Sequence, residues 1–160
     1  TGGEPTLHGK DLIEFIKEVK SLGFLVKLDT NGTHPDVLQE LLNENLLDYI
    51  AMDIKAPLAK YKTITQTDID TKIIKKSIDM IMNSGVDYEF RTTIVKSQLS
   101  VEDLRQIGEL IQGAKRYYMQ KFLATKILDE TLMSEESYTD EEFKNLRTIL
   151  EEYVDFVDYR

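Results

Sequence analysis

Three pairs of oppositely charged residues have the spacing of neighbours on one face of a β-strand. The pairs are Lys27 and Asp29, Asp53 and Lys55, and Glu89 and Arg91. Because side chains two positions apart in a strand point the same way, each pair would present an acid and a base together. Such groups on adjacent strands could bind a small polar ligand that carries both charges. A single pair is explained equally well as a local salt bridge, but three pairs together favour a binding site.

Two further segments supply candidate ligand-binding groups. Gly2-Gly3-Glu4 could bind an ammonium group, because glycines expose backbone carbonyls and a carboxylate is a charge-assisted acceptor. Asp29, Thr30 and Asp53 could hold a hard cation through oxygen atoms, and Lys55 could pair with a ligand carboxylate. The alternatives are a structural glycine turn before a helix, a plain polar turn after a strand, and a solvated lysine.

The elements that must position these residues alternate along the chain. Short apolar runs between turns predict strands, and apolar residues at three- and four-residue spacing predict helices. The predicted strands are 24–29, 47–54, 86–95 and 116–122, and the predicted helices are 11–22, 35–45, 71–84, 100–113 and 139–156. Ser100 with Asp103, and Thr139 with Glu142, are predicted to cap the last two helices. The segments 58–70 and 126–138 are predicted loops.

Connections of this length make crossovers, so we expect an α/β fold with about four parallel strands and five helices. One strand parity is apolar, with Leu28, Ile50 and Phe90, and should face the helices. The other parity carries the charged pairs and Gln120. A closed barrel fills its interior with aliphatic side chains, so this polar face indicates a ligand-holding cavity at the carboxyl ends of the strands. A complete barrel needs about 250 residues, so 160 residues would form part of one.

Composition excludes several classes of function. The 29 acidic residues outnumber the 20 basic residues, and the net charge of −9 argues against a nucleic-acid partner. No apolar run approaches the roughly 20 residues that span a bilayer. The chain has no cysteine, so it cannot hold an iron–sulfur cluster through its own thiolates. Its first residues show no initiator Met and no signal peptide, which indicates the middle of a longer, cytoplasmic protein.

Five motifs in order resemble the radical S-adenosylmethionine (SAM) superfamily. They are Thr1-Gly2-Gly3-Glu4-Pro5, Asp29-Thr30-Asn31-Gly32, Met52-Asp53-Ile54-Lys55-Ala56-Pro57, Glu89-Phe90-Arg91-Thr92-Thr93 and Gln120-Lys121-Phe122. More narrowly, the chain is similar to glycyl-radical activating enzymes, among them the activating proteins of anaerobic ribonucleotide reductase and of pyruvate formate-lyase. The resemblance implies a partial (βα)6 TIM-like barrel, in agreement with the polar face.

The resemblance also implies roles for individual residues. Gly2, Gly3 and Glu4 would bind the amino group of the methionine moiety of S-adenosylmethionine. Lys55 would contact its carboxylate, Arg91 the carboxylate or the ribose, and Gln120 would face the ligand. The implied site for a possible monovalent cation, beside that carboxylate, consists of Asp29, Thr30, Asp53 and the backbone carbonyl of Ala51.

In the family, a one-electron reductant of flavodoxin or ferredoxin type serves a [4Fe-4S] cluster on a CxxxCxxC loop. The resulting 5′-deoxyadenosyl radical takes a hydrogen atom from a glycine of a glycyl-radical enzyme. That cysteine loop is missing here, so the resemblance implies that residues 1–160 are the C-terminal part of the barrel, without the cysteine-loop strand and the second strand. The fragment alone should be inactive, and its exposed barrel edge could self-associate.

Two other interpretations remain open at this stage. The first is a non-catalytic βα binding module or scaffold that is complete as written, which the lack of cysteine favours. The second is part of an ordinary TIM-barrel lyase or isomerase that uses Lys55 as a base or as a Schiff-base lysine.

Overall fold

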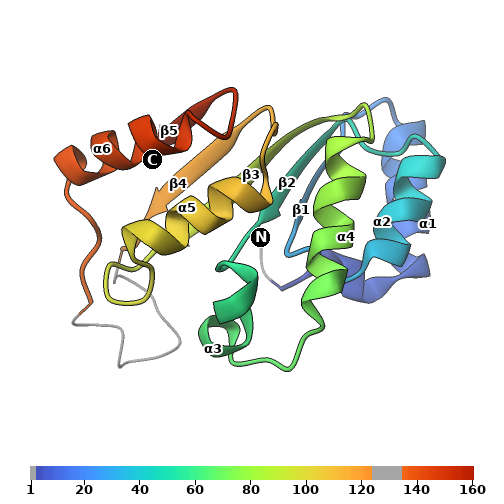
Figure 1. The fold of residues 1–160 in the computed structure, drawn as a ribbon. Helices are drawn as coiled ribbons and strands as arrows, with labels where there is room; N and C mark the ends of the chain where they lie inside the picture. Colours follow the sequence, from blue (N-terminus) through green and yellow to red (C-terminus); the bar gives the residue numbers. More distant parts are fainter. Residues whose placement is uncertain (1–2, 124–134) are drawn as a thin grey trace. The chain divides into compact units, whose positions relative to one another are not determined.

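A five-stranded sheet organises the chain, whose computed structural model describes residues 3–123 and 135–160. The strands are β1 (Lys27–Thr30), β2 (Tyr49–Asp53), β3 (Asp87–Ile94), β4 (Tyr117–Lys121) and β5 (Val157–Tyr159). They follow one another in the sheet in chain order (Figure 1). The registers of β1 with β2, β3 with β4, and β4 with β5 are parallel. The predicted α/β class with a parallel sheet is therefore confirmed.

Helices connect the strands throughout the described residues. The α-helices are α1 (Lys10–Ser21), α2 (Pro35–Asn43), α3 (Tyr61–Thr65), α4 (Thr71–Met82), α5 (Val101–Leu110) and α6 (Asp140–Leu150), and the 3-10 turns are η1 (Pro5–His8) and η2 (Leu58–Lys60). None of these helices is long and apolar enough to cross a bilayer, within the ranges that the structure describes.

The chain divides into two compact units. The first unit consists of residues 1–53 and 68–89, and the second consists of residues 54–67 and 90–160. Strand β3 begins in the first unit and ends in the second.

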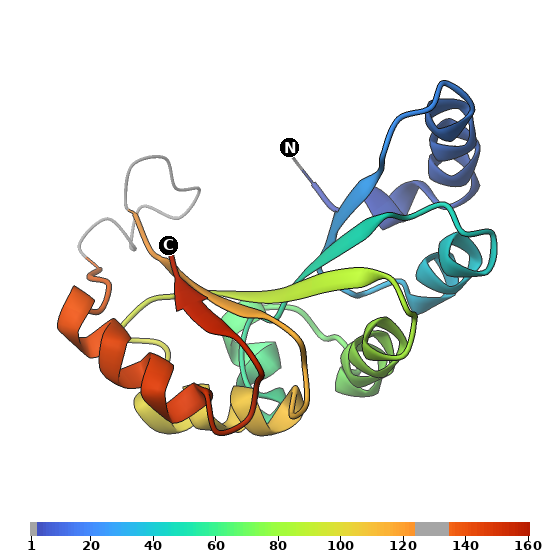
Figure 2. The same cartoon turned by 90° about the horizontal axis from the view of Figure 1, so that it is seen from above.

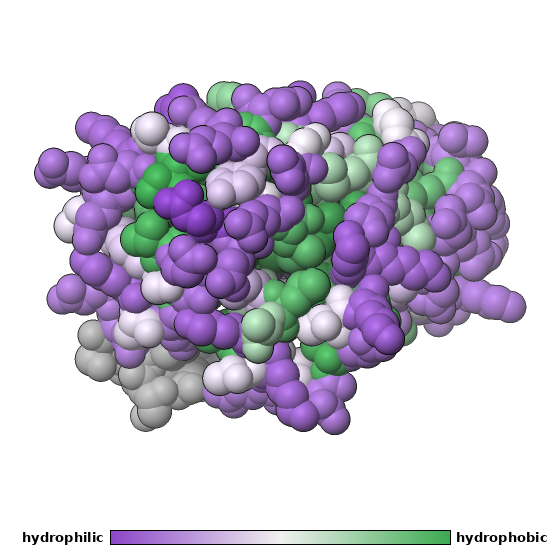
Figure 3. Space-filling view, in the orientation of Figure 1, coloured by the Kyte–Doolittle hydropathy of each residue, from purple (hydrophilic) through white to green (hydrophobic). Residues whose placement is uncertain are grey.

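In the first unit, α1, α2 and α4 lie on the same side of β1 and β2 (Figure 2). Each helix buries one apolar stripe, as its periodicity predicts, and most of its stability comes from this packing. The buried residues are Ile13 and Ile16 of α1, Val37, Leu38 and Leu41 of α2, Ile74, Ile78 and Ile81 of α4, and Leu28, Ile50 and Met52 of the strands. The outer surface over these helices is mainly hydrophilic (Figure 3).

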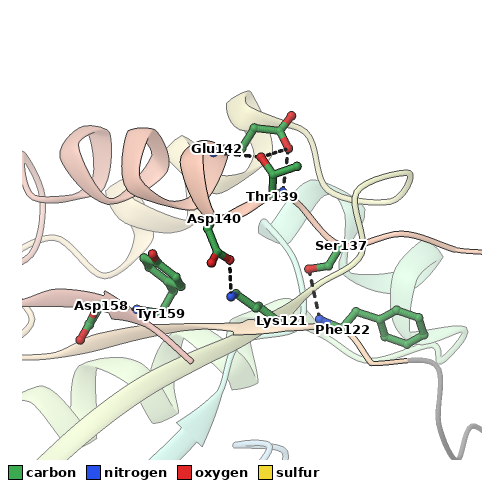
Figure 4. A network of polar contacts seen from close by, with 8 residues as sticks. All are labelled: Lys121, Phe122, Ser137, Thr139, Asp140, Glu142, Asp158 and Tyr159. Carbon is green, nitrogen blue, oxygen red and sulfur yellow. Dashed lines mark hydrogen bonds and ion pairs between the residues drawn. The ribbon is translucent and has the colours of Figure 1, made fainter.

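In the second unit, α5 and α6 pack side by side along β4 and β5 (Figure 2). Both predicted capping boxes are present, at Ser100 with Asp103 and at Thr139 with Glu142. The start of α6 is tied to the sheet by an ion pair between Lys121 and Asp140, and the Lys121 ammonium also lies 5.1 Å from the Tyr159 ring centroid (Figure 4). Local capping and tertiary contacts therefore agree on where α6 begins.

The first predicted strand starts too early. Phe24 and Leu25 are 62% and 83% exposed, and β1 begins at Lys27. Gly23 N donates to Lys20 O and Phe24 N donates to Val19 O, which is the hydrogen-bond pattern of a Schellman motif that ends α1. The amide of Phe24 thus closes the helix and is not available to the sheet.

The C-terminal prediction is wrong in one respect, because the last helix ends at Leu150 and a fifth strand follows it. Backbone contacts with the turn after α5 stop the helix: Gly113 N donates to Tyr153 O at 2.8 Å, and Asp155 N donates to Ala114 O at 3.0 Å. Buried Val157 then places β5 beside β4. These contacts are non-local, so the helical periodicity of the segment did not reveal them.

The predicted loop at 58–70 contains the short elements η2 and α3. Tyr61 is almost fully buried, and Thr65 Oγ1 donates to Tyr61 O at 2.7 Å. One buried aromatic ring therefore orders a segment whose composition is otherwise polar. The described chain has five strands and six α-helices, against the four and five that the sequence predicts.

Candidate functional site

Glu4 connects the start of η1 to the end of β1. Its Oε1 accepts hydrogen bonds from Thr6 N at 3.2 Å and from Thr30 Oγ1 at 2.7 Å, and Thr6 Oγ1 donates to the same oxygen. Its Oε2 accepts from Asn31 N at 2.6 Å. The carboxylate thereby caps η1 and fixes this turn against the carboxyl end of β1.

The Glu4 carboxylate also retains capacity for a ligand. A carboxylate offers about four acceptor positions, two on each oxygen. Among the described residues, Asn31 N is the one recorded donor to Oε2, so this oxygen can accept a further charge-assisted hydrogen bond. The neighbouring Gly3 is exposed, and a Cβ added there would meet no atom within 4 Å. The binding of an ammonium group by Gly3 and Glu4 stays a prediction, and Gly2 lies outside the described residues.

The turn after β1 is held from three directions. Thr30 is buried, and its hydroxyl accepts a hydrogen bond from Gly32 N at 3.1 Å while it donates to Glu4. Ser77 Oγ donates to Gly32 O at 2.7 Å. Gly32 has φ +74°, and a Cβ there would lie 2.2 Å from Met52 Cε. The turn is thus a rigid support for Glu4, and the cation-ligand role of Thr30 stays a prediction.

The sheet face on which Lys27 and Asp29 lie is polar in the first unit. Lys27 Nζ lies 3.3 Å from Asp29 Oδ1, so the local salt bridge considered for this pair is present. The same ammonium lies 5.7 Å from the ring centroid of Tyr49, whose hydroxyl donates to Glu89 Oε2 at 3.1 Å. Glu89 is 5% exposed, and this hydrogen bond offsets part of the cost of burying its carboxylate. Tyr49 was missed from the sequence because its partner is 40 residues away.

The predicted cation site is only partly assembled by what the structure describes. Asp29 stands opposite Ala51 in the register of β1 and β2, and Asp53 ends β2 two residues later. Ala51 is fully buried, whereas Asp29 is exposed and Asp53 is partly buried. No group of three or more His, Asp or Glu side chains that could hold a metal ion occurs among the described residues. The four-residue cation site therefore stays a prediction.

The remaining predicted ligand residues lie on neighbouring strands of the second unit. Ile54, which precedes Lys55, donates its N–H to Arg91 O at 2.7 Å. Arg91 stands opposite Tyr118 in the register of β3 and β4. Two residues further, Thr93 stands opposite Gln120, and the Thr93 hydroxyl donates to Gln120 Oε1 at 3.5 Å. Arg91 and Gln120 therefore share one face of the sheet, as their parity predicts.

Tyr118 lies on this face, as its strand parity predicts, but its contacts with two residues near the C-terminus were not anticipated from the sequence. The guanidinium of Arg160 lies 4.3 Å from the ring centroid of Tyr118, and the Phe156 ring centroid lies 5.8 Å from the same ring. Tyr118 therefore contacts both a cation and a second aromatic ring.

Comparisons with known proteins show the family of this chain. The sequence profile of the radical SAM superfamily matches residues 1–111. A Methanocaldococcus jannaschii protein named "Putative glycyl-radical enzyme activating enzyme" is 36% identical over 164 residues, which cover 100% of this chain and 68% of the relative. A 7-carboxy-7-deazaguanine synthase of Thermococcus kodakarensis is 30% identical over 71% of this chain and 43% of its own length.

A solved structure is similar over the whole chain. It is a domain of pyruvate-formate lyase-activating enzyme from Bacteroides vulgatus, with a TM-score of 0.76 and 17% identity, covering 100% of this chain and 96% of that one. This likeness supports the fold, a partial TIM-like barrel, and the sequence matches support the family. The chain therefore belongs to the radical SAM superfamily.

Proposed function

We propose that this chain is the C-terminal part of a radical SAM activating enzyme and that it binds S-adenosylmethionine at the carboxyl ends of its strands. The observation that carries the proposal is the Glu4 carboxylate, which is fixed at the end of β1 by Thr30 and Asn31 and can still accept at Oε2. A preformed acceptor for an ammonium group is the first requirement for binding the amino-acid moiety of this ligand.

The amino-acid moiety of the ligand has two charged groups, an ammonium and a carboxylate, and the chain has residues of opposite charge for both. Gly2, Gly3 and Glu4 would receive the ammonium group. Lys55 would bind the carboxylate, Arg91 the carboxylate or the ribose, and Gln120 would face the ligand. A monovalent cation held by Asp29, Thr30, Ala51 O and Asp53 would lie beside the ligand carboxylate. It would neutralise part of the negative charge of the two aspartates and of that carboxylate.

The residues present do not fit an iron–sulfur cluster. Such clusters are held by cysteine thiolates, and the chain has none. In an enzyme of this family, the cluster supplies the electron that cleaves the sulfonium of S-adenosylmethionine. We therefore propose that this chain supplies ligand binding but, by itself, does not catalyse the cleavage.

Partners follow from the same proposal. The Methanocaldococcus jannaschii relative is named for activating a glycyl-radical enzyme, and we assign a partner of this kind, together with a one-electron reductant, to the complete enzyme. We also propose that the chain self-associates through β1, which is the first strand of the sheet and which pairs with β2 on one side. The exposed Phe24 and Leu25 precede this strand.

Equilibrium dialysis of the chain against radiolabelled S-adenosylmethionine tests the proposal. We expect saturable binding of one ligand per chain, which Glu4→Ala weakens by about tenfold or more because a charge-assisted hydrogen bond is lost. Lys75→Met is the matched control, because it removes only an exposed ion pair with Asp79 on α4. An unsaturable wild type, or Glu4→Ala binding that equals that of the wild type, would overturn the proposal.

A further inference from the structure

The segment that carries Lys55 is fixed at its start by β3. We call residues 54–61 the Lys55 loop. Ile54 is fully buried, its N–H donates to Arg91 O at 2.7 Å, and its carbonyl accepts from Thr92 Oγ1 at 2.7 Å. Thr92 is itself 1% exposed. The residue before Lys55 is thus attached to the strand that carries Arg91.

A buried tyrosine holds the next backbone group. The Lys55 N–H donates to the Tyr61 hydroxyl at 3.4 Å, so this contact closes the Lys55 loop on itself. Tyr61 is almost fully buried, and Thr65 Oγ1 donates to its carbonyl oxygen at 2.7 Å. A hydroxyl on a fixed ring is therefore the acceptor for the amide of Lys55.

An ion pair anchors the far side of the loop. Lys60 Nζ lies 2.7 Å from Asp103 Oδ2, and the Asp103 side chain is only 6% exposed. The same oxygen accepts from Ser100 N at 2.8 Å and from Ser100 Oγ at 2.7 Å. Burial alone would raise the pKa of Asp103, but the hydrogen bonds from Lys60 and Ser100 lower it below its ordinary value. Asp103 therefore stays ionised and ties the loop to the first turn of α5.

Under the proposed function, the charges of Lys55 and Arg91 explain why the Lys55 loop is held by several contacts. In the proposed function both cations face one ligand carboxylate, and two like charges at close range repel each other. Their alignment requires a framework that holds the two backbones at a fixed separation before the ligand arrives. The Lys55 loop contacts β3, which contains Arg91, and α5, which is the next element in the chain.

We propose that Tyr61, Lys60 and Asp103 are positioning residues, which hold the Lys55 loop so that Lys55 and Arg91 bind the carboxylate of S-adenosylmethionine together. This inference rests on the proposed function. Asp103 then has two separable tasks: it caps α5 through Ser100, and it anchors the loop through Lys60.

Two ligands that differ only in the carboxylate test the proposal. Lys60→Met and Tyr61→Phe should each weaken binding of S-adenosylmethionine by about tenfold, as expected when a residue acts through a ligand-binding side chain. Neither substitution should change the affinity for decarboxylated S-adenosylmethionine, which lacks the group that Lys55 would contact. In a Lys55→Met background, Lys60→Met should have no further effect. Lys60→Arg should restore binding, and Ser100→Ala, which removes a capping hydroxyl but keeps the ion pair, is the matched control.

Amide hydrogen exchange of the ligand-free chain provides the second measurement. Lys60→Met should increase exchange in residues 54–61 and leave the body of α5 unchanged, whereas Ser100→Ala should affect the first turn of α5. Equal losses for both ligands, or unchanged exchange in the Lys55 loop, would overturn the proposed positioning. If the wild type binds neither ligand, the proposed function fails, and the exchange measurement still decides whether these contacts hold the loop.

Discussion

The carboxylate of Glu4 accepts a hydrogen bond from the backbone amide of Asn31 at 2.6 Å, although 27 residues separate them in the chain. This contact places Glu4 at the carboxyl end of β1, where ligands bind in parallel α/β folds. The Glu4 side chain thereby has a structural role, because it holds two turns together. It also has a proposed role in binding, because Oε2 can accept a further hydrogen bond.

The structural task predicts a loss of stability. Glu4→Ala should lower the free energy of unfolding by about 2 kcal/mol, because it leaves Thr30 Oγ1 and Asn31 N without their acceptor in a partly buried site. Urea unfolding monitored by circular dichroism measures this change. Glu14→Ala, on the exposed face of α1, is the control and should change stability by at most about 0.5 kcal/mol. Equal effects of the two substitutions would contradict the described network.

We predict that Gly32→Ala also lowers the stability of the fold, and Gly85→Ala is the matched comparison. Gly32→Ala should cost about 2–3 kcal/mol, because the backbone has a positive φ and the fully buried Met52 side chain, whose Cε would lie 2.2 Å from the new Cβ, must shift. Gly85→Ala has a similar φ of +76° but no atom within 4 Å, so it should cost only about 1–2 kcal/mol. Thermal unfolding of both variants separates backbone strain from the clash, and the account is wrong if Gly85→Ala is the more damaging change.

The lowered pKa of Glu142 predicts that the fold loses stability in acid. Hydrogen bonds from Lys96 and from Thr139, the latter drawn in Figure 4, lower the pKa of Glu142 to about 2 from its ordinary value of 4.5. Because the folded-state pKa is depressed, the stabilisation is present above about pH 4.5 and is lost as the pH falls towards 2. Stability measured across this window should decline less steeply for Glu142→Gln than for the wild type. Glu141→Gln removes the adjacent charge but none of these contacts, and it should decline as the wild type does.

We predict that copies of the chain associate through the β1 edge of the sheet. Phe24 and Leu25 are exposed beside β1, and such an edge promotes pairing between copies of a chain. Sedimentation velocity should show a concentration-dependent dimer, and Leu25→Lys should shift the equilibrium towards the monomer. A monomer at all concentrations for both proteins would exclude this mode of association.

Local signals in the sequence predicted local structure well. The capping boxes at Ser100 and Thr139 and the apolar stripes of the long helices are all present, because each depends on residues within a few positions. The end of α6 and strand β5 were not predicted. They depend on backbone contacts between residues 113–114 and residues 153–155, which no local pattern encodes.

The same distinction holds for the candidate site. The residue types and strand parity of Asp29, Arg91 and Gln120 predict a polar sheet face from the sequence alone. Tyr49 and Lys60 were not identified, because their partners lie 40 and 43 residues away in the chain. Asp103 was recognised only as a cap, since its second partner is visible only in three dimensions.

The most direct test of the account is a titration of the ¹⁵N-labelled chain with S-adenosylmethionine, followed by two-dimensional NMR. The amides of Gly3, Asn31 and Lys55 should shift together and give one dissociation constant at a stoichiometry of one ligand per chain. Different dissociation constants for these amides, or no shifts at saturating ligand, would contradict the proposal that these residues bind one molecule of S-adenosylmethionine.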